Sequence, residues 1–548
     1  MYTLKHNLHY SKKNIFIFLA IIVIISLGLK LITVPFDSLS PNDTSGYVLR
    51  AISHFNGDFT ELPRKSLGWS LFVYPFLGIE NSENFMNLLN SIRGISIIIS
   101  LITIYPMYLL ARRFFDEKYS LVATFLFAVE PHLNHNAGLG LSEPLFILVT
   151  ILSVYFVLTK NPKLFYVAFL LVGVLWWIKF NGIVMLPIVS LLFFLNLKRT
   201  PNLIPKFLLG FSIFFVIVSP MLLERYEMYG DPLYFSQSST LYMGEQVTIV
   251  AENTKHVVYS ASDYINDFGI SQFVNKFIIG GLSNLIEQIL KLSFPYIIFL
   301  FPIGMFFSLR PFDQNSKYIR SNWIVLLGTI AVFVTYFAVV QERRLIFHIL
   351  PFLIIFSIIP IQRLIEYGLS TFSFTTKKKT ISLFIILGII LILAFSFTLR
   401  YEITDKIEEQ EKIVLGNYLL DNFEGKILDS GQALTGLPYA KFNEPHGDFK
   451  IYTIKDDFAG NYDSKIISIS LYGKSLNDFF TVAKEYDLKY IAINKKSDVT
   501  GYYPFLIDVY DNEKDFPFLI PIVTPELLDF KKLQTKIYEI DYQQLNNE

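Results

Sequence analysis

The 548-residue chain is 52% hydrophobic and only 17% charged, with a mean hydropathy of +0.44. This composition is too apolar for an ordinary soluble protein and indicates that much of the surface faces lipid. The 47 basic and 47 acidic residues give a formal net charge of +0 at pH 7, so no overall field favours nucleic acid as a partner. Cysteine is absent, which excludes disulfides, thiolate metal sites and cysteine catalysis.

Apolar runs long enough to cross a bilayer recur along most of the chain, since a spanning helix needs about 20 residues. The first run exceeds the apolar core of a signal peptide and is followed by no small-residue cleavage site, so we interpret it as an uncleaved membrane helix. Hydropathy predicts about eleven spans in all. They cover residues 15–34, 88–110, 119–135, 141–159, 164–178, 180–197, 207–222, 291–309, 322–340, 345–364 and 380–399.

Basic residues mark alternate loops between these spans, and Lys and Arg in short loops stay on the cytoplasmic side. With the N-terminus inside, the inner loops contain Arg112, Arg113, Lys160, Lys163, Lys198, Arg199, Lys206, Arg310, Lys317, Arg320, Lys377, Lys378 and Lys379. The chain is therefore predicted to lie in a cell membrane with its N-terminus in the cytoplasm. The outer face then holds the loops 35–87 and 223–290 and everything after Arg400.

The composition changes after residue 400, where the long apolar runs end and charged residues, Gly and Pro become more frequent. Residues 1–400 are predicted to form an α-helical polytopic membrane domain, and residues 401–548 a separate extracytoplasmic α/β domain. Helical and strand patterns alternate in this tail, as is typical of a small α/β layer domain. The predicted elements are helices at 412–422 and 476–486 and strands at 465–472, 489–494 and 535–542.

The outer loop 35–87 carries the first candidate for chemistry, Asp43. Apolar residues recur after it at helical spacing, which predicts an amphipathic helix on the membrane surface. They are Tyr47, Val48, Ala51, Ile52 and Phe55. Asp43 would begin this helix, where the helix dipole favours the ionised carboxylate. A helix cap and a catalytic base are both compatible with this position.

Arg64 and Lys65 follow in the same loop and place two cations at the predicted interface. Such side chains reach toward lipid phosphates or bind the phosphate of a substrate. Both interpretations remain open from the residues alone.

Glu143 precedes Pro144 at the predicted outer mouth of the fourth span. Capping of a helix explains such a carboxylate, but Asp43 and Glu143 together would supply one outer cavity with two carboxylates for acid/base or metal chemistry. His132 and His135 lie upstream, and His-x-x-His is a weak signal for metal ligation. The candidate metal ligands are therefore Glu143, His132 and His135.

Arg343, Arg344 and His348 lie where the ninth span turns into the tenth, on the predicted outer side and against the rule that places positive charge inside. Paired guanidinium groups suit a phosphate clamp. Anchoring to the phosphates of outer-leaflet lipids is the structural alternative.

Several activities are disfavoured by missing motifs. The sequence has no G-x-x-x-x-G-K-[ST] loop of an ATP-driven transporter, and no D-x-D triplet of the kind that holds a nucleotide-sugar diphosphate. It also lacks a G-x-S-x-G elbow and an H-E-x-x-H motif.

With this layout the chain resembles the glycosyltransferase C superfamily, close to the protein O-mannosyltransferases and the lipid A aminoarabinose transferases. The matching residues are, in chain order, Asp43, Tyr47, Ala51, Lys65, Ser66, Leu67, Arg93, Tyr108, Leu109, Arg112, Arg113, Phe114, Ser142, Glu143, Pro144, Leu145 and Tyr229 to Tyr234. The likeness covers most of residues 1–400. The chain departs from the family pattern because Asn42 precedes Asp43 and no Pro follows Lys65. The tail lacks a Trp-Trp-Asp-Tyr-Gly motif, which argues against an oligosaccharyltransferase that reads Asn sequons.

The resemblance implies a hexosyltransferase, similar to a mannosyltransferase, that takes a sugar from a polyprenyl-phosphate donor of the dolichyl-phosphate type. The acceptor would be a hydroxyl of a protein, glycan or lipid on the outer face, and transfer would invert the anomeric carbon. It implies that Asp43 is the catalytic base and that Glu143 orients the acceptor or a metal. The implied donor-phosphate ligands are Arg64, Lys65, Arg343, Arg344 and His348.

The sequence requires no cofactor and leaves a divalent metal open. The expected partners are the lipid-linked donor, the acceptor and the bilayer. The alternative function is a transporter or flippase of lipid-linked saccharides. The chain shows no repeated half-structure and no Gly/Pro-broken helix pair of the transporter type, which argues against it.

Overall fold

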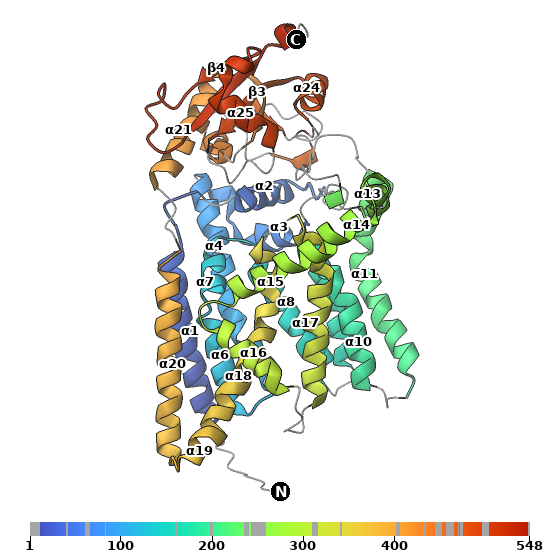
Figure 1. Ribbon diagram of the computed structural model, residues 1–548, viewed down its shortest axis with the longest axis vertical. Helices are drawn as coiled ribbons and strands as arrows, with labels where there is room; N and C mark the ends of the chain where they lie inside the picture. Colours follow the sequence, from blue (N-terminus) through green and yellow to red (C-terminus); the bar gives the residue numbers. More distant parts are fainter. Residues whose placement is uncertain are drawn as a thin grey trace. The chain divides into compact units, whose positions relative to one another are not determined.

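The computed structural model describes residues 11–39, 42–60, 66–82, 84–159, 163–197, 201–234, 241–242, 259–308, 316–339, 342–401, 406–430, 433–443, 452–455, 465–469, 471, 475–495 and 503–545. The chain divides into two compact units. Unit 1 comprises Met1–Val34, Arg93–Leu222 and Lys276–Glu402, and unit 2 comprises Pro35–Ile92, Leu223–Asn275 and Ile403–Glu548. Figure 1 shows their helices and strands, coloured along the sequence.

Unit 1 consists of helices, as its apolar runs predict. Its elements are α1 (Lys12–Thr33), α4 (Phe85–Ile102, which begins in unit 2), α5 (Ile104–Ala111), α6 (Glu117–Ala128), α7 (Pro131–Gly138), α8 (Glu143–Val157), α9 (Leu164–Ile178), η3 (Phe180–Val184), α10 (Met185–Leu197), α11 (Leu203–Tyr229, which ends in unit 2), η4 (Val274–Gly280, which begins in unit 2), α15 (Gly281–Leu292), α16 (Ile297–Ser308), α17 (Ser316–Phe337), η5 (Arg343–Ile349), α18 (Leu350–Arg363), η6 (Leu364–Gly368), α19 (Leu369–Thr371) and α20 (Thr376–Thr398).

Six of the helical stretches in the described residues are long and apolar enough to span a membrane. The stretches Ile270–Leu292 and Ile297–Ser308 form a pair bent by 112°, and the total is seven if this pair counts as one span. Three further apolar helices are shorter, at Glu143–Val157, Leu164–Ile178 and Val325–Phe337. A helix occupies at least part of every predicted span, but the predicted total of eleven is not confirmed. These helices give the chain the character of a multi-pass membrane protein.

The spans of unit 1 differ in how much of their surface other helices cover. The stretch Arg343–Thr371, which contains α18, is 78% buried, whereas the α20 span is 17% buried and the α11 span 22% buried. A central span packs against protein on all sides, whereas an outer span presents its apolar side chains to lipid. In Figure 1, α20 lies beside α1, and the two helices are in contact.

Two glycines allow close helix packing inside unit 1. A Cβ atom at Gly281 would collide with the carbonyl oxygen of Val334, so this glycine brings α15 against α17. A Cβ atom at Gly304 would likewise collide with the carbonyl oxygen of Phe356, at the contact of α16 with α18. Small residues at such crossings are typical of membrane helices, because they let backbones approach closely.

Unit 2 contains short helices from the two predicted outer loops and the whole described tail. The loop elements are α2 (Asn42–Phe55), α3 (Gly68–Val73), η1 (Tyr74–Phe76), η2 (Ile79–Asn81), α13 (Ala261–Phe268) and α14 (Ile270–Phe273). The tail elements are α21 (Lys406–Asn422), β1 (Gly425–Asp429), η7 (Ala433–Gly436), α22 (Leu437–Asn443), β2 (Ile466–Ile469), α24 (Leu476–Glu485), β3 (Leu488–Asn494), η10 (Pro504–Leu506), α25 (Ile507–Asp511), η11 (Glu513–Asp515), β4 (Leu519–Val523), β5 (Thr535–Ile540) and α26 (Tyr542–Leu545).

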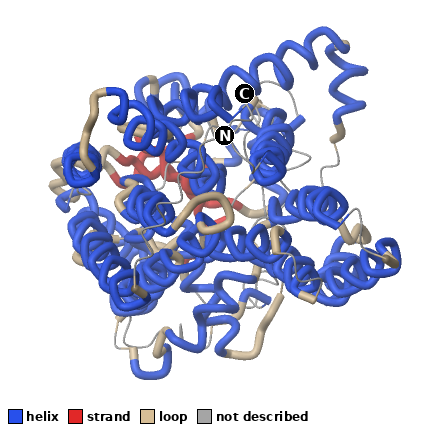
Figure 2. Tube along the Cα trace, turned by 90° about the horizontal axis from the view of Figure 1, so that it is seen from below, coloured by secondary structure: helices blue, strands red, loops and turns tan. Residues whose placement is uncertain are grey.

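The strands of the tail form one mixed sheet of order β2-β1-β3-β5-β4, drawn in red in Figure 2. β1 pairs in parallel with β2 and β3, whereas β5 pairs antiparallel with β3 and β4. The three strands predicted from the sequence correspond to β2, β3 and β5. The sequence pattern missed β1 and β4. β4 contains Pro521, which disfavours a central strand and is accommodated here because β4 lies at the edge.

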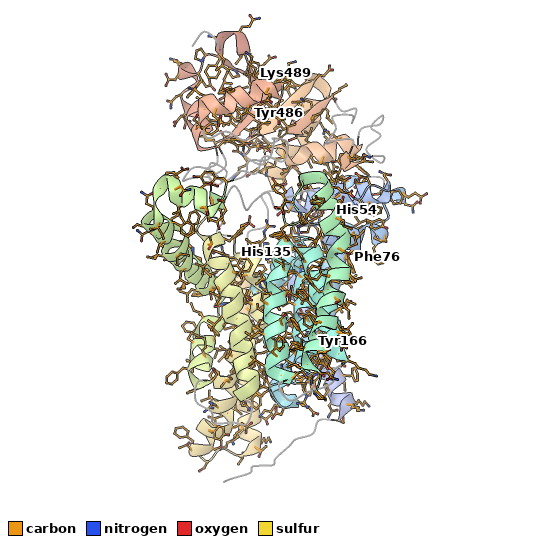
Figure 3. All side chains as sticks on the ribbon, turned by 90° about the vertical axis from the view of Figure 1, so that its right-hand side faces the viewer. His54, Phe76, His135, Tyr166, Tyr486 and Lys489 are labelled. Atoms are coloured by element: carbon orange, nitrogen blue, oxygen red, sulfur yellow. The ribbon has the colours of Figure 1, made fainter. Side chains whose placement is uncertain are left out.

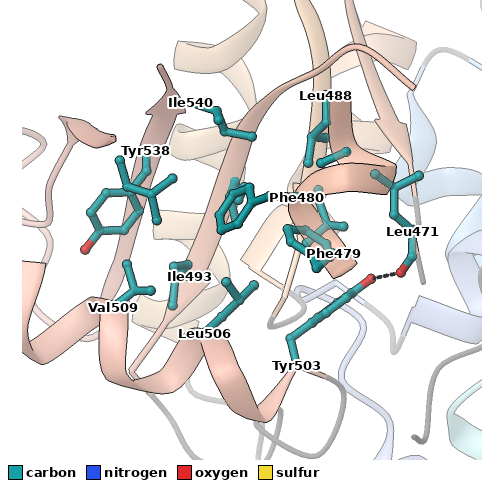
Figure 4. Packing of buried hydrophobic residues seen from close by; sticks show 14 of the residues in the cluster. Leu471, Phe479, Phe480, Leu488, Ile493, Tyr503, Leu506, Val509, Tyr538 and Ile540 are labelled. Carbon is teal, nitrogen blue, oxygen red and sulfur yellow. Dashed lines mark hydrogen bonds between the residues drawn. The ribbon is translucent and has the colours of Figure 1, made fainter. Parts of the chain in front are cut away.

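Helices cover both faces of this sheet, and strand residues alternate between two cores. On one face α21 and α22 pack on Ile427, Tyr490 and Ala492. On the other face α24 and α25 pack on strand residues such as Ile491 and Ile493 (Figure 4). Successive strand side chains point to opposite faces, so this alternation is what a buried three-layer α/β structure requires. The hydroxyl of Tyr503 donates to the carbonyl oxygen of Leu471 at 2.8 Å and closes the second core (Figure 4).

Candidate functional site

Asp43 lies in the first turn of α2, in unit 2. The helix begins at Asn42, so the carboxylate stands at the end where unpaired backbone N–H groups point outward. The dipole of the helix stabilises negative charge there. Asp43 is half-buried. The position suits an ionised carboxylate that accepts a proton.

The apolar stripe of α2 is directed into protein. Val48, Ala51 and Ile52 are fully buried within the structure, while Phe55 is 47% exposed. The predicted helix is confirmed as α2, but the expectation that its apolar stripe rests on lipid is wrong for most of the stripe. Apolar periodicity predicts a buried face but does not distinguish lipid from protein as the partner of that face.

Arg64 and Lys65, the predicted phosphate ligands of the same loop, lie outside the described residues. The described chain resumes at the buried Ser66 and enters α3. Their assignment to a donor phosphate stays a prediction.

In unit 1, the start of α7 holds a buried carboxylate and histidine pair. Glu130 caps the helix, since its Oε2 accepts from the backbone N–H of Leu133 at 2.7 Å. Its Oε1 accepts from Nδ1 of His132 at 2.9 Å, and both side chains are buried. This bond fixes the orientation of the ring, with Nε2 on the side away from Glu130. Among the described residues, Nε2 has no hydrogen-bond partner. A carboxylate behind a histidine is the arrangement that orients an imidazole toward a ligand.

A lysine from α1 completes the buried polar network around α7. Lys30 is 2% exposed and donates to Oδ1 of Asn134 and to Oγ of Ser26. Ser26 in turn donates to the carbonyl oxygen of Ala128 at 2.8 Å. A charge inside a membrane helix is costly unless it is solvated by such partners, so Lys30 fixes α1 against α6 and α7.

His135, labelled in Figure 3, lies one turn further along α7 and stacks on Tyr401. The ring centroids are 4.1 Å apart and the planes differ by 9°. Burial raises the pKa of the Tyr401 hydroxyl; nearby Glu130 raises it further and Arg343 opposes the shift. Tyr401 therefore stays protonated as a hydrogen-bond donor. In the described part of the chain, neither its hydroxyl nor Nδ1 of His135 has a hydrogen-bond partner.

Glu143 begins α8 and forms an ion pair with Lys179. Nζ of Lys179 lies 2.6 Å from Oε1 of Glu143, and the side chains are only 15% and 4% exposed, respectively. The predicted helix-start position is confirmed, whereas the basic partner was not anticipated. Oε2 of Glu143 is buried and has no hydrogen-bond partner within the described ranges. The second oxygen is thus the one that another group can engage.

The three predicted cationic ligands near residue 345 do not share one environment. Arg343 is exposed, and Arg344 is already paired with Glu342, at 2.8 Å between Nε and Oε2. His348 is 4% exposed and packs edge-on against Phe146 at 5.3 Å between ring centroids. Of the three, Arg343 is the one most accessible to a phosphate.

No group of three or more metal-binding side chains occurs among the residues that the structure describes. His132, His135 and Glu143 are therefore not gathered into the metal site that the sequence suggested. Their local partners explain this outcome, because His132 is tied to Glu130, His135 stacks on Tyr401 and Glu143 pairs with Lys179.

Four residues of this region were not singled out from the sequence: Lys30, Glu130, Lys179 and Tyr401. A signal existed for Lys30, which is a lone charge inside an apolar span. Glu130 was also detectable as a helix cap before Pro131. Nothing local indicates the partners of Lys179 and Tyr401, because those partners come from distant helices.

Comparisons with known proteins define the class of the fold. A model of the family described as dolichyl-phosphate-mannose-protein mannosyltransferase matches residues 83–223, which contain Glu130, His132, Glu143 and Lys179. Comparison with curated protein sequences gives no match.

Solved membrane transferases share the fold over most of the chain. The Archaeoglobus fulgidus oligosaccharyltransferase in its apo form matches with a TM-score of 0.59 at 12% identity, over 91% of this chain and 71% of that one. The same protein in complex with zinc and sulfate matches at 0.58 and 13% identity, over 89% and 69%. ArnT from Cupriavidus metallidurans bound to undecaprenyl phosphate matches at 0.54 and 12% identity, over 97% and 98%. The chain thus has the fold of the glycosyltransferase C superfamily, which confirms the resemblance seen in the sequence.

Proposed function

We propose that this chain is a membrane glycosyltransferase that moves a hexose from a polyprenyl-phosphate donor to a hydroxyl of a protein, glycan or lipid acceptor. The observation that carries the proposal is the end-to-end fold match to ArnT, a protein solved with undecaprenyl phosphate. The family match over residues 83–223 agrees with a lipid-phosphate sugar as donor. A mannose-type sugar is the first candidate because of that family.

Asp43 is the proposed base. Its ionised carboxylate removes the proton from the acceptor hydroxyl, and the oxygen then attacks the anomeric carbon of the sugar. The bond between that carbon and the phosphate oxygen breaks, and the polyprenyl phosphate leaves with the bonding electrons. A single displacement of this kind inverts the anomeric configuration. Phosphate is a competent leaving group, so the protein needs one base and cations rather than a covalent intermediate.

Cations assist departure by neutralising charge that grows on the phosphate. Arg343 is an exposed guanidinium of unit 1 that suits this role, and Arg64 and Lys65 are proposed from the sequence to act with it. Glu143, held by Lys179, is proposed to orient the acceptor through its second oxygen. His348 is too buried to bind the donor, so we assign it to packing.

A zinc complex of the oligosaccharyltransferase raises the question of a metal. In unit 1, His132 presents an unengaged Nε2 backed by Glu130, which is a suitable single ligand. One such ligand does not make a metal site, and the described residues supply no set of three. The proposed reaction therefore contains no step that depends on a metal.

We also propose that the reaction occurs on the outer face, with the N-terminus and Lys377–Lys379, at the start of α20, in the cytoplasm and the tail outside. Alternating basic loops support this orientation. Fusions of a topology reporter to Glu548 test it, because a reporter active only in the cytoplasm would reverse every assignment to the outer face.

The function itself is tested with full-length protein in membrane vesicles and two donors, polyprenyl-phosphate mannose and polyprenyl-phosphate aminoarabinose, each with a radiolabelled sugar. We expect one donor to yield free polyprenyl phosphate and a labelled acceptor. Asp43→Asn should lower this turnover about 10²-fold, since it removes the base. Glu80→Gln, an exposed carboxylate in the same outer loop, is the matched control and should leave turnover unchanged. Movement of intact donor across the membrane without release of sugar would instead identify a flippase.

A further inference from the structure

A segment of the tail, 452–455, is hydrogen-bonded to the end of α2 opposite Asp43. The backbone N–H of Ile454 donates to Oγ of Ser53 at 3.0 Å, and that of Lys455 donates to Oδ2 of Asp58 at 2.9 Å. Nδ2 of Asn56 donates to the carbonyl oxygen of Tyr452 at 3.0 Å. These bonds join residues about four hundred positions apart within unit 2. They form what we call the Asp58 junction.

The carboxylate of Asp58 organises this junction. Oδ2 also accepts from the hydroxyl of Ser53 at 2.8 Å, while Oδ1 accepts from the N–H and the hydroxyl of Thr60 at 3.0 and 2.6 Å. Burial alone raises the pKa of Asp58, but the hydrogen bonds from Thr60, Lys455 and Ser53 together bring it below its usual value. An ionised carboxylate that accepts four hydrogen bonds is a firm anchor, because charge-assisted bonds are the stronger kind.

The backbone places Asp58 at this point by a turn that needs glycine. Gly57 has φ of 82°, in the left-handed region, and its N–H donates to the carbonyl oxygen of His54. The N–H of Asp58 donates to the carbonyl oxygen of Ser53. These two backbone hydrogen bonds cap the C-terminal end of α2, and the chain then reverses its direction and returns toward the helix.

The same turn is connected to α3, the helix that follows the basic pair Arg64 and Lys65. Nδ1 of His54 donates to the carbonyl oxygen of Asp58 at 2.9 Å, and its Nε2 lies 3.1 Å from Oγ of Ser70 in α3. The ring stacks on Phe59 at 5.2 Å between centroids (His54 is labelled in Figure 3). The junction therefore holds together the helix with the proposed base, the helix after the basic pair, and the tail.

We infer that the Asp58 junction positions α2 for catalysis, so that docking of the 452–455 segment fixes where Asp43 meets the acceptor. This inference rests on the proposed function. Asp43 and Ser53 are ten residues apart in one helix, which corresponds to about 15 Å at 1.5 Å per residue. Asp58 does not touch reacting atoms, so it is a positioning residue. A displacement of about 1 Å at the base is enough to lower turnover strongly.

Loss of the junction tests the inference in the full-length protein. Asp58→Asn and Ser53→Ala should each lower kcat about tenfold for whichever of the two donors wild type consumes, with KM for that donor within about twofold. Ser475→Ala is the matched control. It removes the hydrogen bond that caps α24, a helix of the same tail that is not part of the Asp58 junction. It should leave kcat unchanged. A purely structural role predicts instead that all three variants lose folded protein while each folded molecule keeps its turnover.

A disulfide provides the rescue that a structural role would not give. The chain contains no cysteine, so Ser53→Cys with Ile454→Cys introduces its sole pair of thiols. Oxidation should join them in most molecules, as measured by mass spectrometry of the cleaved chain. The oxidised variant should have a kcat close to that of wild type. Reduction of the disulfide should lower kcat about tenfold, and reoxidation should restore it.

The possible failures are distinguishable. A pair that does not oxidise, or a kcat that is the same in the oxidised and reduced forms, overturns the inference. If Asp43→Asn retains turnover, or if neither donor is consumed, the proposed function fails, and the disulfide yield still reports whether the segment docks.

Discussion

Asp43 and Glu143 are two carboxylates with the same local signature and different surroundings. Each lies in the first turn of a helix, where the dipole favours negative charge. Glu143 is nevertheless 3% exposed and bound to Lys179, whereas Asp43 is half-buried. The local sequence around the two carboxylates is similar, but their surroundings in the fold differ. In the proposed reaction, the buried carboxylate paired with a cation orients the acceptor, and the more exposed one takes up the proton.

The largest effect is expected from breaking the pair at Glu143. Lys179→Met leaves a buried carboxylate without its cation, and removal of one partner of a buried ion pair costs about 3–5 kcal/mol. We expect the thermal unfolding midpoint in detergent to fall accordingly.

The double variant Glu143→Gln with Lys179→Met is the control for that prediction. It removes both charges, so stability should recover toward wild type, because replacing a buried pair by neutral groups is often neutral. If the single and double variants were equally unstable, the ion pair would not be what holds α8 to the segment after α9.

A smaller loss is expected from Glu411 in the tail, which has no role in the proposed chemistry. Its carboxylate accepts from the backbone N–H groups of Lys531, Lys532 and Leu533, at 2.7, 3.0 and 2.6 Å. Glu411→Gln replaces one acceptor oxygen by an amide and should cost about 2 kcal/mol in unfolding of the tail. Turnover by the remaining folded protein should be unchanged. A parallel loss of kcat would mean that the tail takes part in the reaction beyond positioning.

Asp43→Asn should have little effect on stability. Asn keeps the shape of Asp, and loss of the charge at a helix start costs about 0.3–1 kcal/mol. A small loss of stability together with the expected 10²-fold loss of turnover identifies a catalytic base, because a residue that only stabilises α2 would not lower the turnover of folded protein. Glu143→Gln should show the reverse balance, with the larger change in the unfolding midpoint. If the two variants lost turnover and thermal stability in the same proportion, the proposed difference between the two carboxylates would be wrong.

The smallest effect concerns pH and His54. Burial lowers the pKa of His54 below its ordinary 6.5, while the hydrogen bond to the Asp58 carbonyl opposes this shift and nearby Arg50 adds to it. As the pH falls below 6.5, His54 is protonated in the unfolded chain before it is protonated in the folded chain. The free energy of unfolding therefore decreases in that pH range. The slope is at most about 1.4 kcal/mol per pH unit.

His54→Phe keeps an aromatic ring for the stack on Phe59 and removes the titration. Unfolding midpoints of wild type and variant, measured from pH 7 to pH 5, should converge as the pH falls. A wild type that loses no more stability than the variant over this range would show that His54 does not titrate differently on folding.

Much of the fold was predictable from the sequence. The ranges of the predicted spans all contain helices, because apolar runs of this length have few other stable arrangements in lipid. Their division was less predictable. Breaks such as that between α15 and α16 shorten several spans, and hydropathy does not register a bend. In the tail, β4 was missed because Pro521 opposes a strand locally and only its edge position permits one.

The candidate site was predictable where one residue carries its own signal. Asp43 and Glu143 were found as acidic residues at helix starts, and Arg343 as a cation against the charge rule. The partners were not predictable. Lys179 lies between two predicted spans and Tyr401 begins the predicted tail, and neither carries a local sign that the first neutralises Glu143 or that the second stacks on His135.

By itself the sequence determined that this is a polytopic membrane protein with an α/β tail, and which stretches contain its long helices and three of its strands. These features depend on hydropathy and periodicity, which are properties of neighbouring residues. The tertiary structure alone decided which buried charges are paired, which apolar stripe faces protein, and that Asp58 holds a segment four hundred residues away. The physical reason is that a buried charge or N–H group is stabilised by whatever partner packing brings to it, and that partner leaves no mark in the sequence beside it.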